Sequence, residues 1–122
     1  MNSTIKNFIV FIIAMFAGGL LVMGIEMVVQ MVISSAEHMD PRRLALIVLA
    51  HGMGAFLSGW IISRFSMSAS NIWIWVSALL WTLGGVLNLV SNISHPFWFA
   101  IADTCIYLPM TILGSRFSGK KV

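Results

Sequence analysis

Charge is scarce in this chain of 122 residues, because only 9% of them are Asp, Glu, Lys or Arg. A soluble domain carries about 25% charged residues. Here 59% of the residues are hydrophobic and the mean hydropathy is +0.96. These values exclude an ordinary soluble globule, a disordered tail and a nucleic-acid-binding arm. They indicate a chain whose surroundings are mostly the lipid bilayer.

Cysteine and catalytic motifs are also scarce. The single Cys105 excludes an intrachain disulfide and a zinc site built from thiolates. The sequence has no P-loop, dinucleotide-binding, nucleophile-elbow, haem-attachment or His-Glu-x-x-His motif, so nothing in it argues for an enzyme or names a cofactor. The net charge of +3 comes from basic residues at the ends of apolar segments, where they act as topology signals. We therefore expect no nucleic-acid partner.

Four apolar segments are each long enough to cross the hydrocarbon core, which takes roughly 20 helical residues. They run over about 8–33, 44–62, 72–90 and 97–113. The links between them are short, and short links make consecutive helices antiparallel. Asp40 and Pro41 predict the start of the second helix, because Asp caps and Pro fits the first turn. The sequence thus predicts an all-α, up-down bundle of four transmembrane helices, with residues 1–122 as a single domain.

Lysine and arginine are divided unequally between the two ends of these spans. Five of the seven lie on the side of both termini: Lys6, Arg64, Arg116, Lys120 and Lys121. Arg42 and Arg43 lie on the other side. The excess predicts that both termini are cytoplasmic. All four acids lie in the opposite half: Glu26, Glu37, Asp40 and Asp103.

A faint internal repeat links the second and fourth spans. The string Ser63-Arg64-Phe65-Ser66 recurs 52 positions later as Ser115-Arg116-Phe117-Ser118, and at this offset His51 falls on Asp103. A true repeat predicts two helical hairpins related by an axis along the membrane normal. Two glycine pairs, 18–19 and 84–85, give a different offset of 66, and coincidence in an apolar sequence is the alternative.

Ionisable groups from three spans fall at one depth. Glu26 lies eight residues before Ser34, His51 eight residues after Arg43, and Asp103 eight residues after His95. Each is therefore roughly 12 Å below the non-cytoplasmic surface at 1.5 Å per residue. Asn88 lies about one turn closer to that surface. An ionised side chain in the bilayer costs about 2.5–3.5 kcal/mol, so we expect these groups to face the bundle interior. Tyr107 completes the predicted site as part of its hydrogen-bonding lining.

Helical spacing predicts which face of each span carries this site. The expected interior residues of the first two spans are Gly19, Met23, Glu26 and Gln30, followed by His51, Ala55, Ser58 and Ile62. Those of the last two spans are Ser77, Trp81, Gly84 and Asn88, followed by Phe99, Asp103, Tyr107, Met110 and Gly114.

Three other interpretations of these polar residues stay open. They can be structural, holding the helices in register through hydrogen bonds. Glu26, His51 and Asp103 can hold zinc or another divalent metal, because carboxylate and imidazole are suitable ligands. The row of Met23, Met27 and Met31 can bind Cu(I) through its thioethers, or can fill apolar space.

Several strings between residues 50 and 114 resemble a group of small four-helix bacterial inner-membrane proteins without an assigned activity. They are Ala50-His51-Gly52-Met53-Gly54-Ala55-Phe56, Gly84-Gly85, His95-Pro96-Phe97-Trp98-Phe99, Asp103, Tyr107-Leu108-Pro109-Met110 and Gly114. The resemblance also covers the acid in the first span. It implies the four-helix fold and a location in the bacterial inner membrane, and it implies no activity.

The function that the sequence favours is transport or conduction of a proton, a cation or a small polar solute. In this interpretation Glu26 and Asp103 carry charge or protons, His51 is their titrating partner, and Asn88 and Tyr107 line the site. The alternative is a non-transporting accessory or scaffold subunit of a larger membrane complex, and a membrane-embedded enzyme or metal protein is a third class. We expect the chain to form a homo-oligomer, with a different protein as a further candidate partner.

Overall fold

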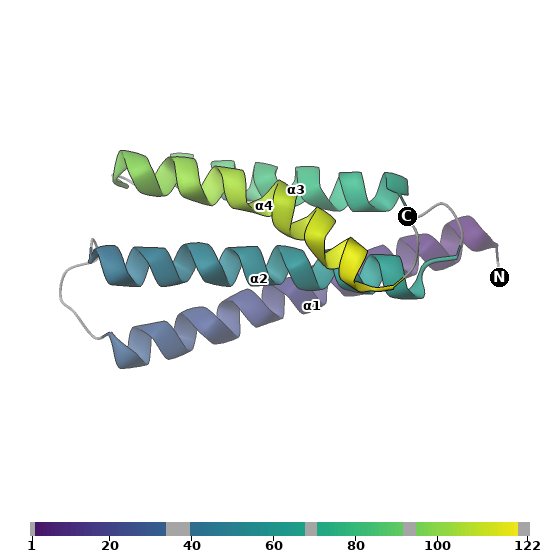
Figure 1. Ribbon diagram of the computed structural model, residues 1–122, viewed down its shortest axis with the longest axis horizontal. Coiled ribbons are helices and arrows are strands. Elements are labelled where there is room, and N and C mark those ends of the chain that lie inside the picture. Colours follow the sequence, from purple (N-terminus) through teal and green to yellow (C-terminus); the bar gives the residue numbers. More distant parts are fainter. Residues whose placement is uncertain (1, 34–39, 68–70, 92–94, 120–122) are drawn as a thin grey trace.

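The computed structural model describes residues 2–33, 40–67, 71–91 and 95–119, which form four helices and no strand. The helices are α1 (Ser3–Val32), α2 (Pro41–Phe65), α3 (Asn71–Ser91) and α4 (Phe97–Phe117). Each is long and apolar enough to cross a membrane. Consecutive helices run in opposite directions, so α1 begins and α4 ends at the same end of the bundle, here called the terminal end (Figure 1). The predicted all-α bundle of four spans is confirmed.

The helices extend beyond several of the predicted spans. The first begins at Ser3 rather than residue 8, the second covers three more residues at each end, and the fourth ends at Phe117 rather than 113. The predicted spans end where the apolar residues end, whereas a helix continues until its terminal backbone groups are capped. The predicted start of α2 is confirmed, because Asp40 Oδ1 accepts the Arg42 backbone N–H at 2.9 Å and Pro41 occupies the first turn.

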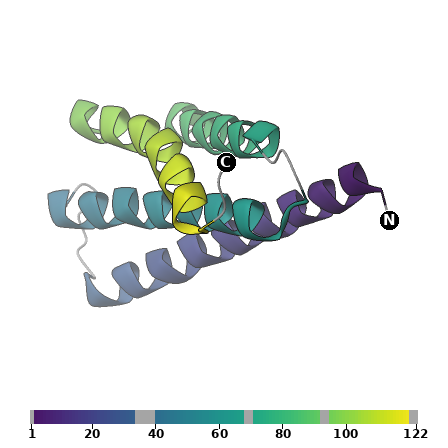
Figure 2. The ribbon, with the colours of Figure 1, turned by 45° about the vertical axis from the view of Figure 1, so that its right-hand side comes forward.

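Helix α2 is the centre of the bundle. It contacts the other three helices and packs most extensively against α4 and α1. At the end where α2 begins, both views of the ribbon place α1 on one side of α2 and α4 on the other, whereas toward the terminal end α1 crosses α2 and also contacts α3 (Figures 1 and 2). The largest interface is the one between α2 and α4. These two helices run in the same direction, because consecutive helices alternate and α3 lies between them in the chain.

Glycines bring the backbones of α2 and α4 close together. A Cβ at Gly59 would overlap the carbonyl oxygen of Thr111, and a Cβ at Gly114 would overlap the carbonyl oxygen of Phe56. Small residues at such positions let two membrane helices approach closely and gain van der Waals contact. This contact matters because no hydrophobic effect drives helices together in lipid.

Two apolar clusters flank the depth at which His51 lies. One cluster, toward the terminal end, consists of Phe11, Ala14, Ile62 and Ile74. The other, toward the start of α2 and α4, consists of Leu44, Val48 and Phe99. The polar centre therefore lies between two layers of packed hydrocarbon.

The buried face of α1 differs from the prediction. Met23 is 61% exposed, Gln30 is exposed, and a Cβ at Gly19 would meet no atom within 4 Å. The residues that α1 buries are instead Asn7, Phe11, Ala14, Gly18, Val22 and Val29. The prediction failed because α1 is apolar on all sides, so that no polar stripe marks its outer face. The predicted face of α2 is confirmed, since its four residues His51, Ala55, Ser58 and Ile62 are all buried.

Candidate functional site

The imidazole of His51 lies between two carboxylates from two other helices. Its Nδ1 is 2.5 Å from Asp103 Oδ1 on α4, and its Nε2 is 2.9 Å from Glu26 Oε1 on α1. The structure therefore brings together the three ionisable residues that share a depth in the sequence. Both ring nitrogens are engaged, which makes His51 the bridge between the two acids.

The contact between Glu26 and His51 follows from the antiparallel packing of α1 on α2. Gly18 and Gly54 face each other in this interface, where a Cβ on either would lie 2.6 or 2.8 Å from the carbonyl oxygen of the other. Side chains lean toward the N-terminus of their own helix. The alignment of Gly18 with Gly54 places Glu26 nearer the start of α2 than His51. In this antiparallel pair the two side chains therefore lean toward each other.

The contact between His51 and Asp103 follows from the parallel packing of α2 on α4. The two residues are 52 positions apart, and Gly59 contacts Thr111 at the same separation (111 − 59 = 52). Two parallel helices hold a constant register, so a close approach at Gly59 also aligns the residues two turns earlier.

Tyr107 closes the group from α4. Its hydroxyl donates to Asp103 Oδ2 at 3.2 Å and lies 3.0 Å from His51 Nδ1. The Tyr107 ring stacks on His51 with 5.8 Å between centroids, and on Trp81 of α3 with 5.9 Å. Gly85 of α3 makes room for this ring, because a Cβ there would overlap it.

Burial divides the two acids. The Asp103 side chain is fully buried, whereas the Glu26 side chain is 40% exposed. His51 and Tyr107 are 7% and 2% exposed. Glu26 is therefore the member of the group that reaches the outside of the bundle, and its position meets the expectation of an interior group only in part.

A cavity of about 190 Å³ opens beside the group between α1 and α3. Asn88 lines it together with His51 and Tyr107, although Asn88 itself is exposed on α3. The remaining lining residues are Met15, Val22, Leu80, Trp81, Gly84 and Gly85. All five predicted site residues thus lie in or beside one region of the bundle, while their functional role stays a prediction.

The sequence placed Ser58 and Trp81 on interior faces and did not assign them to the site. The Trp81 indole Nε1 donates to Ser58 Oγ at 3.1 Å, and this hydroxyl lies 2.9 Å from the Ala14 carbonyl oxygen and 3.0 Å from that of Gly54. This network holds the indole against Tyr107. The only signal in the sequence is that Ser58 lies two turns after His51 on the same helical face.

The geometry bears on both metal hypotheses. No group of three or more His, Cys, Asp or Glu residues in the described part of the chain is arranged to hold a metal ion. Both nitrogens of His51 face carboxylates, so a metal at this residue would have to displace one of these contacts. Met23, Met27 and Met31 lie on the outer face of α1 and are 61%, 58% and 74% exposed.

Comparison with known proteins yields no relative. The chain matches no protein-family model, no curated protein and no solved structure. The resemblance to small four-helix bacterial inner-membrane proteins therefore stays a prediction, and any function must be argued from the site itself.

Proposed function

We propose that this membrane protein transports or conducts protons, with Glu26, His51 and Asp103 as the proton-carrying groups. The observation that carries the proposal is the position of His51, whose two ring nitrogens each contact a carboxylate from a different helix. Ionisable residues are expensive within a membrane span, so a cluster of them indicates a functional site by default.

The proton transfer between the two acids needs only these side chains. A proton on Glu26 moves to Nε2 of the neutral imidazole, and the proton already on Nδ1 moves to Asp103. The imidazole is neutral again, in its other tautomer, and the proton has crossed from a half-exposed acid to a buried one. The Tyr107 hydroxyl donates to Asp103 and so stabilises the carboxylate form of this acid between transfers.

The cavity between α1 and α3 supplies a route to this group from the outside. Its volume of about 190 Å³ accommodates several water molecules or a small polar solute. Asn88, His51 and Tyr107 are the polar residues in its lining, whereas the remaining walls are apolar or aromatic. A cation or small polar solute that shares this cavity with protons is compatible with the same site.

The direction of the chain in the membrane is part of the proposal. Lys6, Arg64 and Arg116 lie at the terminal end of the bundle, and the positive-inside rule assigns such an end to the cytoplasm. Lys120, Lys121 and Glu37, which belong to the same argument, lie outside the described residues. With this orientation in a bacterial inner membrane, the proton site is nearer the periplasmic surface.

The test is proton flux into proteoliposomes that contain the purified chain, driven by a potassium diffusion potential and followed with an enclosed pH dye. We expect His51→Gln, Glu26→Gln and Asp103→Asn each to lower the flux at least tenfold, because an amide cannot carry the proton. Asp40→Asn is the matched control, since it makes the same acid-to-amide change at the start of α2.

Helical circular dichroism and a monodisperse elution profile show whether each variant is folded. A folded His51→Gln variant with the flux of the unsubstituted protein would contradict the proposal. So would an Asp40→Asn variant that loses as much flux as the site variants.

One observation favours association as a second candidate function. Glu26 is 40% exposed, and Gln30 lies exposed one turn further along the same helix. Polar side chains in membrane spans are satisfied by other helices. We propose that a second copy of the chain, or a helix of a larger complex for which this chain is an accessory subunit, covers this part of α1.

Cross-linking and native mass spectrometry in mild detergent test this association. A stable homo-oligomer that conducts protons supports the leading proposal. A stoichiometric foreign partner, together with an isolated chain that is folded and inactive, supports the accessory role.

A further inference from the structure

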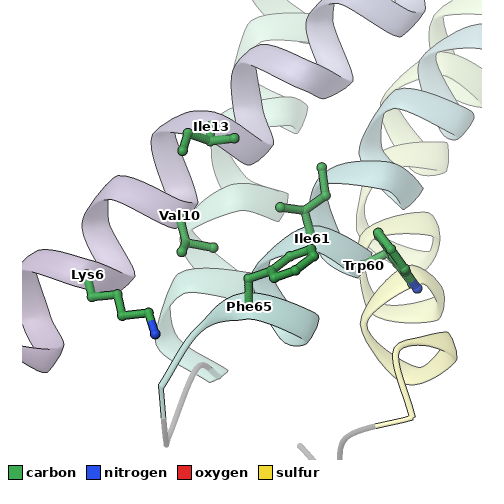
Figure 3. A pocket seen from close by; sticks show the side chains of 6 residues that line it. All are labelled: Lys6, Val10, Ile13, Trp60, Ile61 and Phe65. Carbon is green, nitrogen blue, oxygen red and sulfur yellow. The ribbon is translucent and has the colours of Figure 1, made fainter.

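A second, larger cavity lies between α1 and α2 near the terminal end of the bundle. It is a groove of about 490 Å³ with almost entirely apolar walls. Figure 3 shows its six lining residues, three from α1 and three from α2: Lys6, Val10, Ile13, Trp60, Ile61 and Phe65. We call it the α1–α2 groove. Its volume falls in the range of about 300–1,000 Å³ that is usual for ligand pockets.

Among the described residues that line the α1–α2 groove, Lys6 is the only charged one. The residue is half-buried, and it forms no ion pair with any acid in the described ranges. The three described acids, Glu26, Asp40 and Asp103, all lie toward the opposite end of the bundle. The groove therefore combines a long apolar wall with one positive charge that no acid among the described residues neutralises.

The depth of the groove matches the boundary between headgroups and hydrocarbon. The apolar run of α1 begins at Phe8, directly after Lys6. Helix α1 has 30 residues, or roughly 45 Å, against a hydrocarbon core of about 30 Å, so its first turns reach the headgroup layer. From Lys6 to Ile13 the groove descends roughly 10 Å toward the bilayer centre.

The walls favour a flexible, unbranched hydrocarbon chain. Val10 and Ile13 form one side, and Ile61 and Phe65 form the other (Figure 3). Trp60 contacts the Phe65 ring edge-on, with 6.1 Å between centroids, which gives the α2 side a rigid aromatic surface. An acyl chain fills such a space without leaving a polar atom unsatisfied.

We propose that the α1–α2 groove binds one anionic phospholipid, with an acyl chain along its apolar walls and the phosphate group paired with Lys6. The phosphate oxygens accept charge-assisted hydrogen bonds from the Lys6 ammonium group. A zwitterionic lipid adds a second positive charge beside Lys6 and binds less tightly. The inference is independent of the proposed proton transport.

Native mass spectrometry of the full chain in detergent, titrated with dioleoylphosphatidylglycerol or dioleoylphosphatidylcholine, tests the headgroup. We expect one phosphatidylglycerol to bind more tightly than phosphatidylcholine. Lys6→Gln should weaken phosphatidylglycerol binding about fivefold, the usual contribution of one basic residue at an anionic membrane surface. Arg116→Gln is the matched control, because it removes one charge at the same end of the bundle outside the groove, and it should leave binding nearly unchanged.

A second pair of variants tests the acyl-chain site. Ile13→Trp fills the groove and should abolish the bound phosphatidylglycerol, whereas Ile9→Trp makes the same change at an exposed α1 residue outside the groove and should not. Equal binding of the two lipids, or equal loss in Lys6→Gln and Arg116→Gln, would overturn the proposal. Displacement of the lipid by equimolar oleate would assign the groove to a free fatty acid instead. The Lys6→Gln comparison decides the headgroup even if Ile13→Trp does not fold.

Discussion

Gly59 of α2 packs directly against the carbonyl oxygen of Thr111 on α4, at the same separation of 52 residues that joins His51 to Asp103. The same separation therefore relates a close backbone contact and a buried polar contact of this interface. The same offset relates the two Ser-Arg-Phe-Ser strings, which meet at the terminal end, where Ser63 Oγ lies 2.7 Å from Ser118 Oγ. The two hairpins are not equivalent, because α1 packs more extensively on α2 than α3 does on α4.

Replacement of Gly59 by alanine should destabilise the bundle by about 1–3 kcal/mol, because the new methyl group would force α2 away from Thr111. Gly19→Ala is the control, since a Cβ there meets no atom within 4 Å. Unfolding by dodecyl sulfate, followed by circular dichroism, measures both free energies. An equal effect of the two substitutions would contradict the close approach of Gly59 to Thr111.

Gly85→Ala should displace the ring of Tyr107, because a Cβ at residue 85 would overlap it. Tyr107 is the only tyrosine of the chain, so 3-fluorotyrosine labelling yields a single ¹⁹F resonance. We expect Gly85→Ala to shift this resonance, and Gly84→Ala, whose Cβ faces open space, to leave it in place. A resonance that responds equally to both changes would place the ring elsewhere.

Asp103→Asn should cost more stability than Glu26→Gln. Asp103 is fully buried and contacts both His51 and Tyr107, so the loss of the charge disturbs two buried hydrogen bonds, worth about 1–3 kcal/mol together. Glu26 is partly exposed and makes one such contact, for which about 0.6 kcal/mol is typical in membranes. Unfolding free energies of the two variants give the order directly, and the reverse order would argue against the burial of Asp103.

The N-cap of α2 should respond to pH. Hydrogen bonds from the Arg42 side chain and backbone hold the pKa of the Asp40 carboxyl below its ordinary value of 3.8. Because the pKa is lowered in the folded state, the cap stabilises the helix fully at a pH above 3.8. This stabilisation is lost as the pH falls through the lowered pKa. The Arg42 amide proton resonance should therefore titrate with a midpoint below 3.8.

Asp40→Asn supplies the control for that titration. Asparagine also caps helices, so the first turn of α2 should persist while the Arg42 amide resonance no longer titrates in this range. A midpoint above 3.8 in the unsubstituted protein would show that the carboxylate does not accept these hydrogen bonds.

Counting along the sequence was sufficient to place Glu26, His51 and Asp103 at one level, because helical rise is constant and each residue lies eight positions from a residue that flanks its span. It was insufficient for Met23 and Gln30, which the structure leaves on the outer face of α1. In a helix that is apolar all round, neither face is marked by hydropathy. The choice between faces depends on Gly18 and Val22, whose shapes fit α2 at Gly54.

The sequence by itself determined that the chain forms four membrane-spanning helices, that they alternate in direction, and that three ionisable groups share one depth. These properties depend on composition, loop length and helical rise, which are local. The tertiary structure alone decided that α2 packs on α4, that Glu26 reaches the outside while Asp103 does not, and that a groove beside Lys6 stays open. These properties depend on which small residues let two backbones approach, and that is settled only when all four helices pack together.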